Sequence, residues 1–283
     1  MKIALSCETT VDLTKELLEK FDIKLIPFSV LLGENNFFDG EVTCDDIIAF
    51  VNENKILPKT GAVNKTQYDE HFSSLLKEYD AVIHISLSSE ISSACSNAKL
   101  SASEFSNVYV IDSRSLSTGI ALLAIYARKL IDEGKEPDEI CFLVAERIPF
   151  VQASFELKRV DYLYKGGRCS MLAYLGANLL KIRPQMVVRE GKILAGKKYR
   201  GKYKHVVENY CDDVLEEFDN PDLETAFLTY TTAEEEILEI AKKALTDRGF
   251  KNIYITRAGA TITSHCGEGC LGILFINDGK SNG

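Results

Sequence analysis

The chain has 283 residues, of which 46% are hydrophobic and 27% are charged, a composition typical of a soluble globular protein with one or two domains. Its 33 Lys and Arg against 42 Asp and Glu leave a net charge of −9, which argues against a nucleic-acid-binding protein. No apolar run reaches the length of a membrane span and the first residues do not resemble a signal peptide, so we expect a cytoplasmic protein.

The eight cysteines of such a protein are expected to be reduced thiols. Only Cys266 and Cys270 are close in sequence, and their spacing beside His265 is not that of a zinc site. We therefore expect neither a metal nor another cofactor.

The first half of the chain alternates strand-like and helix-like segments. In chain order these are the strand Lys2–Ser6, the helix Val11–Phe21, the apolar run Ile23–Leu32, a helix that Thr43 caps with Asp46, a short loop at 59–63, the helix Lys65–Tyr79, the strand Ala81–Leu87, a helix starting near Ser92, the strand Asn107–Ile111, the helix Ile120–Ile131 and a helix from Pro137. This alternation predicts an α/β fold whose N-terminal domain, residues 1–150, contains a doubly wound, mostly parallel sheet.

A loop rich in serine follows the strand Ala81–Leu87 and leads into the next helix. The first backbone N–H groups of a helix are unpaired and its N-terminus carries a partial positive charge, so serine hydroxyls there suit a carboxylate or a phosphate. The alternative interpretation is that Ser92 only caps the helix.

The second half predicts another α/β domain, residues 151–283, with a mixed sheet. Its expected elements are a helix-like run Met171–Leu180, two strands joined by a hairpin turn at 189–192, the helix Lys202–Phe218, the strand Ala226–Thr231, the helix Ala233–Asp247 capped by Thr232 with Glu235 and closed by Gly249, and the strands Ile253–Ile255 and Ile273–Ile276.

Two motifs invite other functions. Gly267, Gly269 and Gly272 have the G-x-G-x-x-G spacing of a dinucleotide site, but only eleven residues follow and they resemble a strand, so we expect a turn. Ser92 with His265 suggests a Ser–His hydrolase or acyltransferase, although the G-x-S-x-G motif of the α/β-hydrolases is missing.

The charge is unevenly distributed. Residues 165–204 contain eleven Lys and Arg but only one acid, Glu190, so this window carries +10 and the rest of the chain −19. The window is either a solvated basic face or a docking surface for an acidic partner or a phosphate.

Short motifs along nearly the whole chain resemble those of the DegV family of fatty-acid-binding proteins. They are Cys7–Leu13 (CETTVDL), Phe38–Gly40 (FDG), Lys59–Gly61 (KTG), Ser88–Ala94 (SSEISSA), Asp112-Ser113, Lys165–Arg168 (KGGR), Arg200–Lys202 (RGK) and His265–Gly269 (HCGEG). No single motif is decisive, and the resemblance rests on their shared order.

The resemblance implies a lipid-binding protein that is not an enzyme, which holds a long-chain fatty acid in a tunnel between the two domains. Thr60 and Ser92 would bind the carboxylate together with backbone amides around Gly61 and Ser93, with His265 nearby.

The resemblance also implies partners. A fatty acid kinase would convert the presented carboxylate to an acyl phosphate for phospholipid metabolism, and transient contact with a membrane is expected. We expect the kinase to dock on a face that includes Arg168, Arg200 and Lys202. The alternatives are a hydrolase or acyltransferase that uses Ser92 and His265, and a lipid-sensing protein without a kinase.

Overall fold

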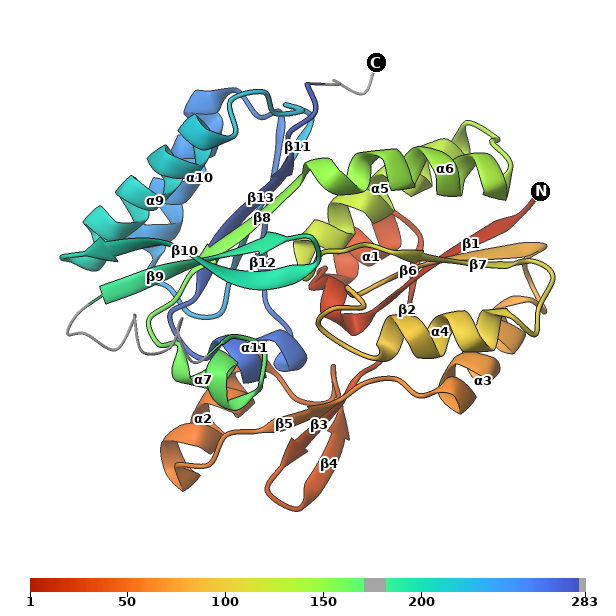
Figure 1. The fold of residues 1–283 in the computed structure, drawn as a ribbon, viewed down its shortest axis with the longest axis horizontal. Helices are drawn as coiled ribbons and strands as arrows, with labels where there is room; N and C mark the ends of the chain where they lie inside the picture. Colours follow the sequence, from red (N-terminus) through yellow and green to blue (C-terminus); the bar gives the residue numbers. More distant parts are fainter. Residues whose placement is uncertain (171–181, 280–283) are drawn as a thin grey trace.

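The computed structural model describes residues 1–170 and 182–279 (Figure 1). The predicted helix Met171–Leu180 lies outside these ranges. None of the helices in the described ranges combines the length and the apolar character needed to cross a bilayer.

The first half forms a four-stranded parallel sheet in the order β2-β1-β6-β7. Its strands are β1 (Ile3–Glu8), β2 (Ile23–Ile26), β6 (Ala81–Ser86) and β7 (Val108–Asp112). The segments around it are η1 (Thr9–Val11), α1 (Lys15–Lys20), α3 (Lys65–Leu75), α4 (Ala94–Ala102), α5 (Thr118–Asp132), α6 (Pro137–Arg147) and η2 (Ile148–Phe150). Because α4 covers one face and α5 with α6 the other, the predicted doubly wound α/β sheet is confirmed (Figure 1).

Three expectations about this half are wrong in detail. The run Ile23–Leu32 is divided at Pro27, which has no backbone N–H to donate, and its first part, β2, is an edge strand of the parallel sheet. Its second part joins a small antiparallel sheet, β4-β3-β5, made of β3 (Ser29–Leu32), β4 (Asn35–Phe38) and β5 (Lys59–Gly61), with α2 (Cys44–Asn54) between β4 and β5. Residues 59–61 are therefore a strand and not a loop. The first helix begins only after Thr14, whose hydroxyl accepts a hydrogen bond from the backbone N–H of Leu17.

The second half forms a six-stranded mixed sheet in the order β10-β9-β8-β13-β11-β12. Its strands are β8 (Val151–Glu156), β9 (Ile182–Arg189), β10 (Lys192–Arg200), β11 (Thr225–Tyr230), β12 (Asn252–Arg257) and β13 (Leu271–Ile276). Its helices are α7 (Asp161–Lys165), α9 (Tyr203–Glu217), α10 (Glu235–Arg248) and α11 (Ala260–Cys266). The mixed sheet and the hairpin turn at 189–192 are as predicted.

Three elements of this half have no counterpart among the expected elements, and one cap is wrong. These elements are strand β8 and the short helices α7 and α11. Helix α10 begins at Glu235, and Thr232 does not cap it, because the Thr232 hydroxyl accepts a hydrogen bond from the N–H of Gly269. Gly249 ends α10 in the left-handed conformation, as expected.

One apolar core continues from the first half into the second. It contains Leu5 and Ile85 of the parallel sheet together with Phe155, Phe227 and Leu274 of the mixed sheet, and helix α5 packs against both sheets (Figure 1). A division into domains at residue 150 stays a prediction.

Candidate functional site

The candidate site lies at the carboxyl end of the parallel sheet, where β6 passes through residues 87–93 into α4. Helix α4 begins at Ala94, so Ser93 directly precedes it, and the Ser93 side chain makes no capping hydrogen bond. The Ser92 hydroxyl accepts a hydrogen bond from the Ala94 N–H at 3.2 Å. The capping role considered for Ser92 is thus present, but an accepting hydroxyl keeps its own proton for a ligand.

A fully buried carboxylate holds the start of this loop. Glu8, at the end of β1, accepts hydrogen bonds from the Leu87 N–H at 2.9 Å, the Tyr68 hydroxyl at 2.6 Å and the Ser86 hydroxyl. Burial raises the pKa of Glu8, but the adjacent His84 and these hydrogen bonds outweigh burial and hold the pKa below its usual value. The backbone that leads to Ser92 is therefore anchored to the sheet.

Residues from distant parts of the chain meet at a cavity of about 40 Å³ beside this loop. Thr60 of β5, Ser92, His265 of α11 and Arg168 all line it, and Gly61 adjoins Thr60 at the end of β5. Apolar side chains complete the lining, including Phe28, Ile91, Leu116, Phe155, Ile193 and Ile262. The structure therefore brings together Thr60, Ser92 and His265, as the family resemblance implies.

The His265 imidazole is held in place by a hydroxyl on one side and a glycine on the other. Nε2 is hydrogen-bonded to the Thr60 hydroxyl at 2.8 Å, and an added Cβ on Gly166 would lie 2.5 Å from Nδ1. Burial and the positive charge of Arg168 lower the pKa of His265 to about 4, so the ring is neutral at pH 7.

This geometry does not favour the hydrolase alternative. A catalytic histidine would hydrogen-bond to its nucleophile, whereas Nε2 of His265 is hydrogen-bonded to Thr60, and Nδ1 has no hydrogen-bond partner among the described residues.

The three basic residues predicted to dock a partner do not share one environment. Arg168 is partly buried and lines the cavity, and its Nη1 donates a hydrogen bond to the Gly166 carbonyl at 2.6 Å. Arg200, the last residue of β10, and Lys202, which precedes α9, are exposed. The guanidinium of Arg168 thus folds back onto its own turn, and its docking role stays a prediction.

Half of the ten described Lys and Arg of the basic window 165–204 are paired with acids from other segments. Among the described residues, the pairs are Arg183 with Glu156, Arg189 with Glu217, Lys192 with Glu90, Lys197 with Asp213, and Lys204 with Glu236. The excess positive charge of the sequence therefore overstates the free positive charge of this surface.

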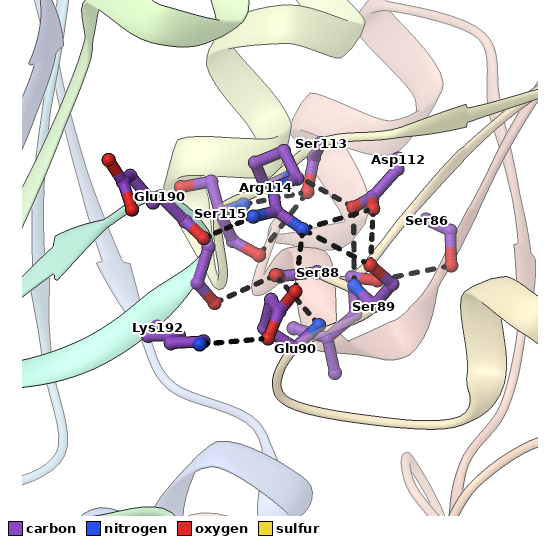
Figure 2. Close-up of polar contacts among 12 residues, drawn as sticks. Ser86, Ser88, Ser89, Glu90, Asp112, Ser113, Arg114, Ser115, Glu190 and Lys192 are labelled. Atoms are coloured by element: carbon purple, nitrogen blue, oxygen red, sulfur yellow. Dashed lines mark hydrogen bonds and ion pairs between the residues drawn. The ribbon is translucent and has the colours of Figure 1, made fainter.

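The turn between β9 and β10 is docked on the serine loop (Figure 2). Arg114 donates hydrogen bonds to the Glu190 carbonyl and, at 3.2 Å, to the Glu90 carboxylate, while the Ser88 hydroxyl donates to the Gly191 carbonyl at 2.8 Å. These contacts place the hairpin beside the site, where Ile193 lines the cavity.

Two aspartates from the first half position the helix that carries His265. The Asp39 carboxylate accepts hydrogen bonds from the N–H groups of Ala260 at 3.0 Å and Thr261 at 3.1 Å, and Asp12 accepts one from Gly259 at 2.8 Å. Burial raises the pKa of Asp12 to about 8, and the neighbouring Asp39 contributes to this rise. Sequence reasoning missed this role, although both aspartates stand in motifs that it singled out.

Two further hollows adjoin the site. A second cavity of about 30 Å³ shares Leu116, Phe155, Ile262 and Cys266 with the first. An open groove of about 740 Å³ between Arg114, the β9–β10 turn and Phe218 has none of the predicted carboxylate-binding residues in its lining. Within the described ranges, no three His, Cys, Asp or Glu side chains are grouped to hold a metal ion.

Comparisons with known proteins agree with the resemblance seen in the sequence. A family model described as "Uncharacterised protein, DegV family" matches residues 2–278. A DegV domain-containing protein of Clostridium acetobutylicum is 31% identical over 280 residues, which are 97% of this chain and 98% of that protein. A fatty acid-binding protein of Thermotoga maritima is 27% identical over 279 residues, 96% of each chain.

A solved structure extends the agreement to three dimensions. The crystal structure of DegV, a fatty acid binding protein from Bacillus subtilis, superimposes with a TM-score of 0.85 at 28% identity. The alignment covers 98% of this chain and all of that one.

Proposed function

This chain belongs to the DegV family, and we propose that it binds a long-chain fatty acid with the carboxylate at Thr60, Ser92 and His265. The observation that carries the proposal is the convergence of these side chains and Arg168, from separate segments, on one cavity with a mostly apolar lining. The fatty acid-binding relatives, which cover nearly the same length, supply the class of ligand.

The chemistry of the cavity suits a carboxylate. The Ser92 hydroxyl has a proton to donate, the Arg168 guanidinium carries a positive charge, and no acid belongs to the described lining. Hydrogen bonds to an ionised acceptor contribute roughly 1.5–3 kcal/mol each. We also propose that backbone amides around Gly61 and Ser93 take part.

The tail needs apolar space, and we propose that it occupies the region of the two small cavities. Together they are far smaller than the roughly 300 Å³ at which ligand pockets begin. Binding would therefore displace the side chains shared by both cavities, above all Phe155 and Ile262. Burial of about fifteen methylenes at ~0.8 kcal/mol each, on the order of 12 kcal/mol gross, is large enough to drive this rearrangement.

Binding of oleate by purified protein, followed by displacement of a fluorescent fatty acid, tests the proposal. Ser92→Ala and Thr60→Ala should each weaken binding about tenfold or more, because each removes a hydrogen bond to the carboxylate. Ser103→Ala, at the far end of α4, is the matched control and should bind as the wild type does. If Ser92→Ala and Thr60→Ala both bound oleate as tightly as the wild type, the carboxylate would have to bind elsewhere.

We further propose that the bound carboxylate is presented to a partner kinase in the cytoplasm. A free carboxylate is a poor acyl donor, and conversion to an acyl phosphate needs a nucleotide that a partner brings. Arg200 and Lys202 support the proposal because they are exposed at the β10–α9 junction. Arg168 cannot separate docking from binding, since it lines the cavity.

Charge reversal at Arg200 and Lys202 separates docking of the kinase from binding of the fatty acid. Arg200→Glu with Lys202→Glu should leave the oleate affinity unchanged and lower acyl phosphate formation by a fatty acid kinase, more so at low salt. Lys242→Glu on α10 is the control. Unchanged turnover by the double variant would remove this surface from the interface.

A further inference from the structure

Thr261 stands one helical turn before His265 on α11, and both side chains line the 40 Å³ cavity. Residues four apart share one face of a helix, so the hydroxyl and the imidazole face the same space. Ile262, the next residue of the helix, lines both cavities, whereas Thr261 lines only the first of the two. Thr261 therefore belongs to the polar end of the site.

The Thr261 hydroxyl is a buried polar group without a partner. The residue is 3% exposed, and Oγ1 has no hydrogen bond to any residue that the structure describes. Other hydroxyls of the same helix are satisfied, because Thr263 donates to the Ala258 carbonyl and Ser264 to the Ala260 carbonyl. Buried hydroxyls are nearly always paired, so this one points to a group that is bound in function.

The helix backbone holds Thr261 in this position. Its N–H donates to Oδ2 of Asp39, and the N–H groups of Ala260 and Gly259 donate to Asp39 and Asp12. These three hydrogen bonds tie the start of α11 to the first half of the protein. The hydroxyl is therefore presented to the cavity by an anchored helix turn.

The cavity determines what kind of group the hydroxyl meets. Ser92 and Arg168 offer protons, and the described lining includes no carboxylate, so the missing partner is an acceptor that carries negative charge. We propose that Thr261 donates a hydrogen bond to the carboxylate of the bound fatty acid and so favours the acid over uncharged lipids of the same chain. This inference rests on the proposed function and adds a carboxylate-binding residue that no sequence motif indicated.

The test compares two lipids that differ only in the head group, oleate and oleyl alcohol. Thr261→Val keeps the shape of the side chain and removes the hydroxyl, and it should weaken oleate binding about tenfold while changing oleyl alcohol binding much less. Thr261→Ser keeps the hydroxyl and should restore the preference for oleate. Thr263→Val is the matched control, because the Thr263 hydroxyl donates to the Ala258 carbonyl, and it should keep the wild-type ratio of the two affinities.

Stability without ligand gives a second readout. Because the hydroxyl is unpaired in the free protein, Thr261→Val should unfold at the same or a higher urea concentration than the wild type, although it binds oleate more weakly. If Thr261→Val bound oleate as tightly as the wild type, the inference would be overturned. It would also be overturned if the variant lost equal affinity for both lipids or were less stable than the wild type, because Thr261 would then act through packing. If the wild type bound no oleate at all, the proposed function itself would fail.

Discussion

At the scale of single residues, the structure explains why the motif Lys165–Arg168 contains two glycines. Gly166 leaves the space that the His265 ring occupies, since a Cβ there would lie 2.5 Å from Nδ1. Gly167 has a φ of +74°, which glycine adopts without strain, and it turns the chain so that Arg168 reaches the cavity. The two glycines thus serve different needs.

Replacement of Gly166 by alanine should therefore act on the site more than on the fold. Its φ of −74° is open to alanine, but the methyl group would push His265 away from Thr60. We expect Gly166→Ala to bind oleate several-fold more weakly in fluorescence displacement. Lys165→Ala, an exposed neighbour, should bind normally, and unchanged binding by Gly166→Ala would contradict this role for the glycine.

Asp12 gives the protein a stability that depends on pH. Its pKa is about 8 in the folded protein against 3.8 ordinarily, so the folded state binds the proton more tightly than the unfolded chain does. The stabilisation is complete below about pH 4 and declines as the pH rises toward 8. Asp12→Asn, which still offers an oxygen to the Gly259 N–H, should gain in free energy of unfolding relative to wild type between pH 5 and pH 8. Urea unfolding at both values checks this, and parallel pH profiles would show that Asp12 does not titrate in this range.

At the scale of elements, the β9–β10 hairpin is held at its tip by contacts between the two halves (Figure 2). Gly191 is central to them, because its φ is +79° and an added Cβ would lie 2.6 Å from the Ser88 hydroxyl and 2.9 Å from the Arg114 guanidinium. Docking of this tip keeps Ile193 of β10 against the cavity.

A pair of glycines separates backbone strain from docking. Gly201 also has a positive φ, +116°, yet nothing lies within 4 Å of an added Cβ there. Gly191→Ala and Gly201→Ala should both lower the unfolding temperature through strain, but only Gly191→Ala should also speed oleate dissociation, because the hairpin leaves the site. Stopped-flow dissociation measures the difference, and equal rates for the two variants would mean that the tip does not hold the ligand.

At the scale of the whole molecule, the site joins segments that lie far apart in sequence. The Thr60 to His265 hydrogen bond spans 205 residues, and one core continues through both sheets. A ligand at this site therefore contacts both halves of the chain at once.

Fatty acid should consequently stabilise the entire protein. A ligand that binds only the folded state adds RT ln(1 + [L]/Kd), which is about 2.7 kcal/mol at a hundredfold excess over Kd. Scanning calorimetry with oleate should show the whole unfolding transition move to higher temperature. Acetate, which has the carboxylate without the tail, is the control and should cause no shift, whereas a shift confined to part of the transition would mean that the ligand contacts only one half.

Much of this architecture can be predicted from the sequence, because local sequence patterns determine local structure. Alternating apolar runs predict the parallel sheet, Thr43 with Asp46 predicts the capping box that begins α2, and the glycine at 191 predicts the hairpin turn. The order of the short motifs indicates the family, while ligand binding by the serine loop stays a prediction.

Other features depend on surfaces that meet only in the folded protein. Strand β8 alternates apolar and polar residues, a strand signal that the prediction overlooked. The alternation suggests a half-exposed strand, whereas Gln152 and Ser154 are buried inside the mixed sheet and hydrogen-bonded to each other, which only the folded protein reveals. Helix α11 has seven residues, too few for a periodic pattern, and its start is held by Asp39 from more than 220 residues away. Because long-range contacts leave no local pattern, the pairing of His265 with Thr60, the inward turn of Arg168 and the unpaired hydroxyl of Thr261 emerge only from tertiary packing.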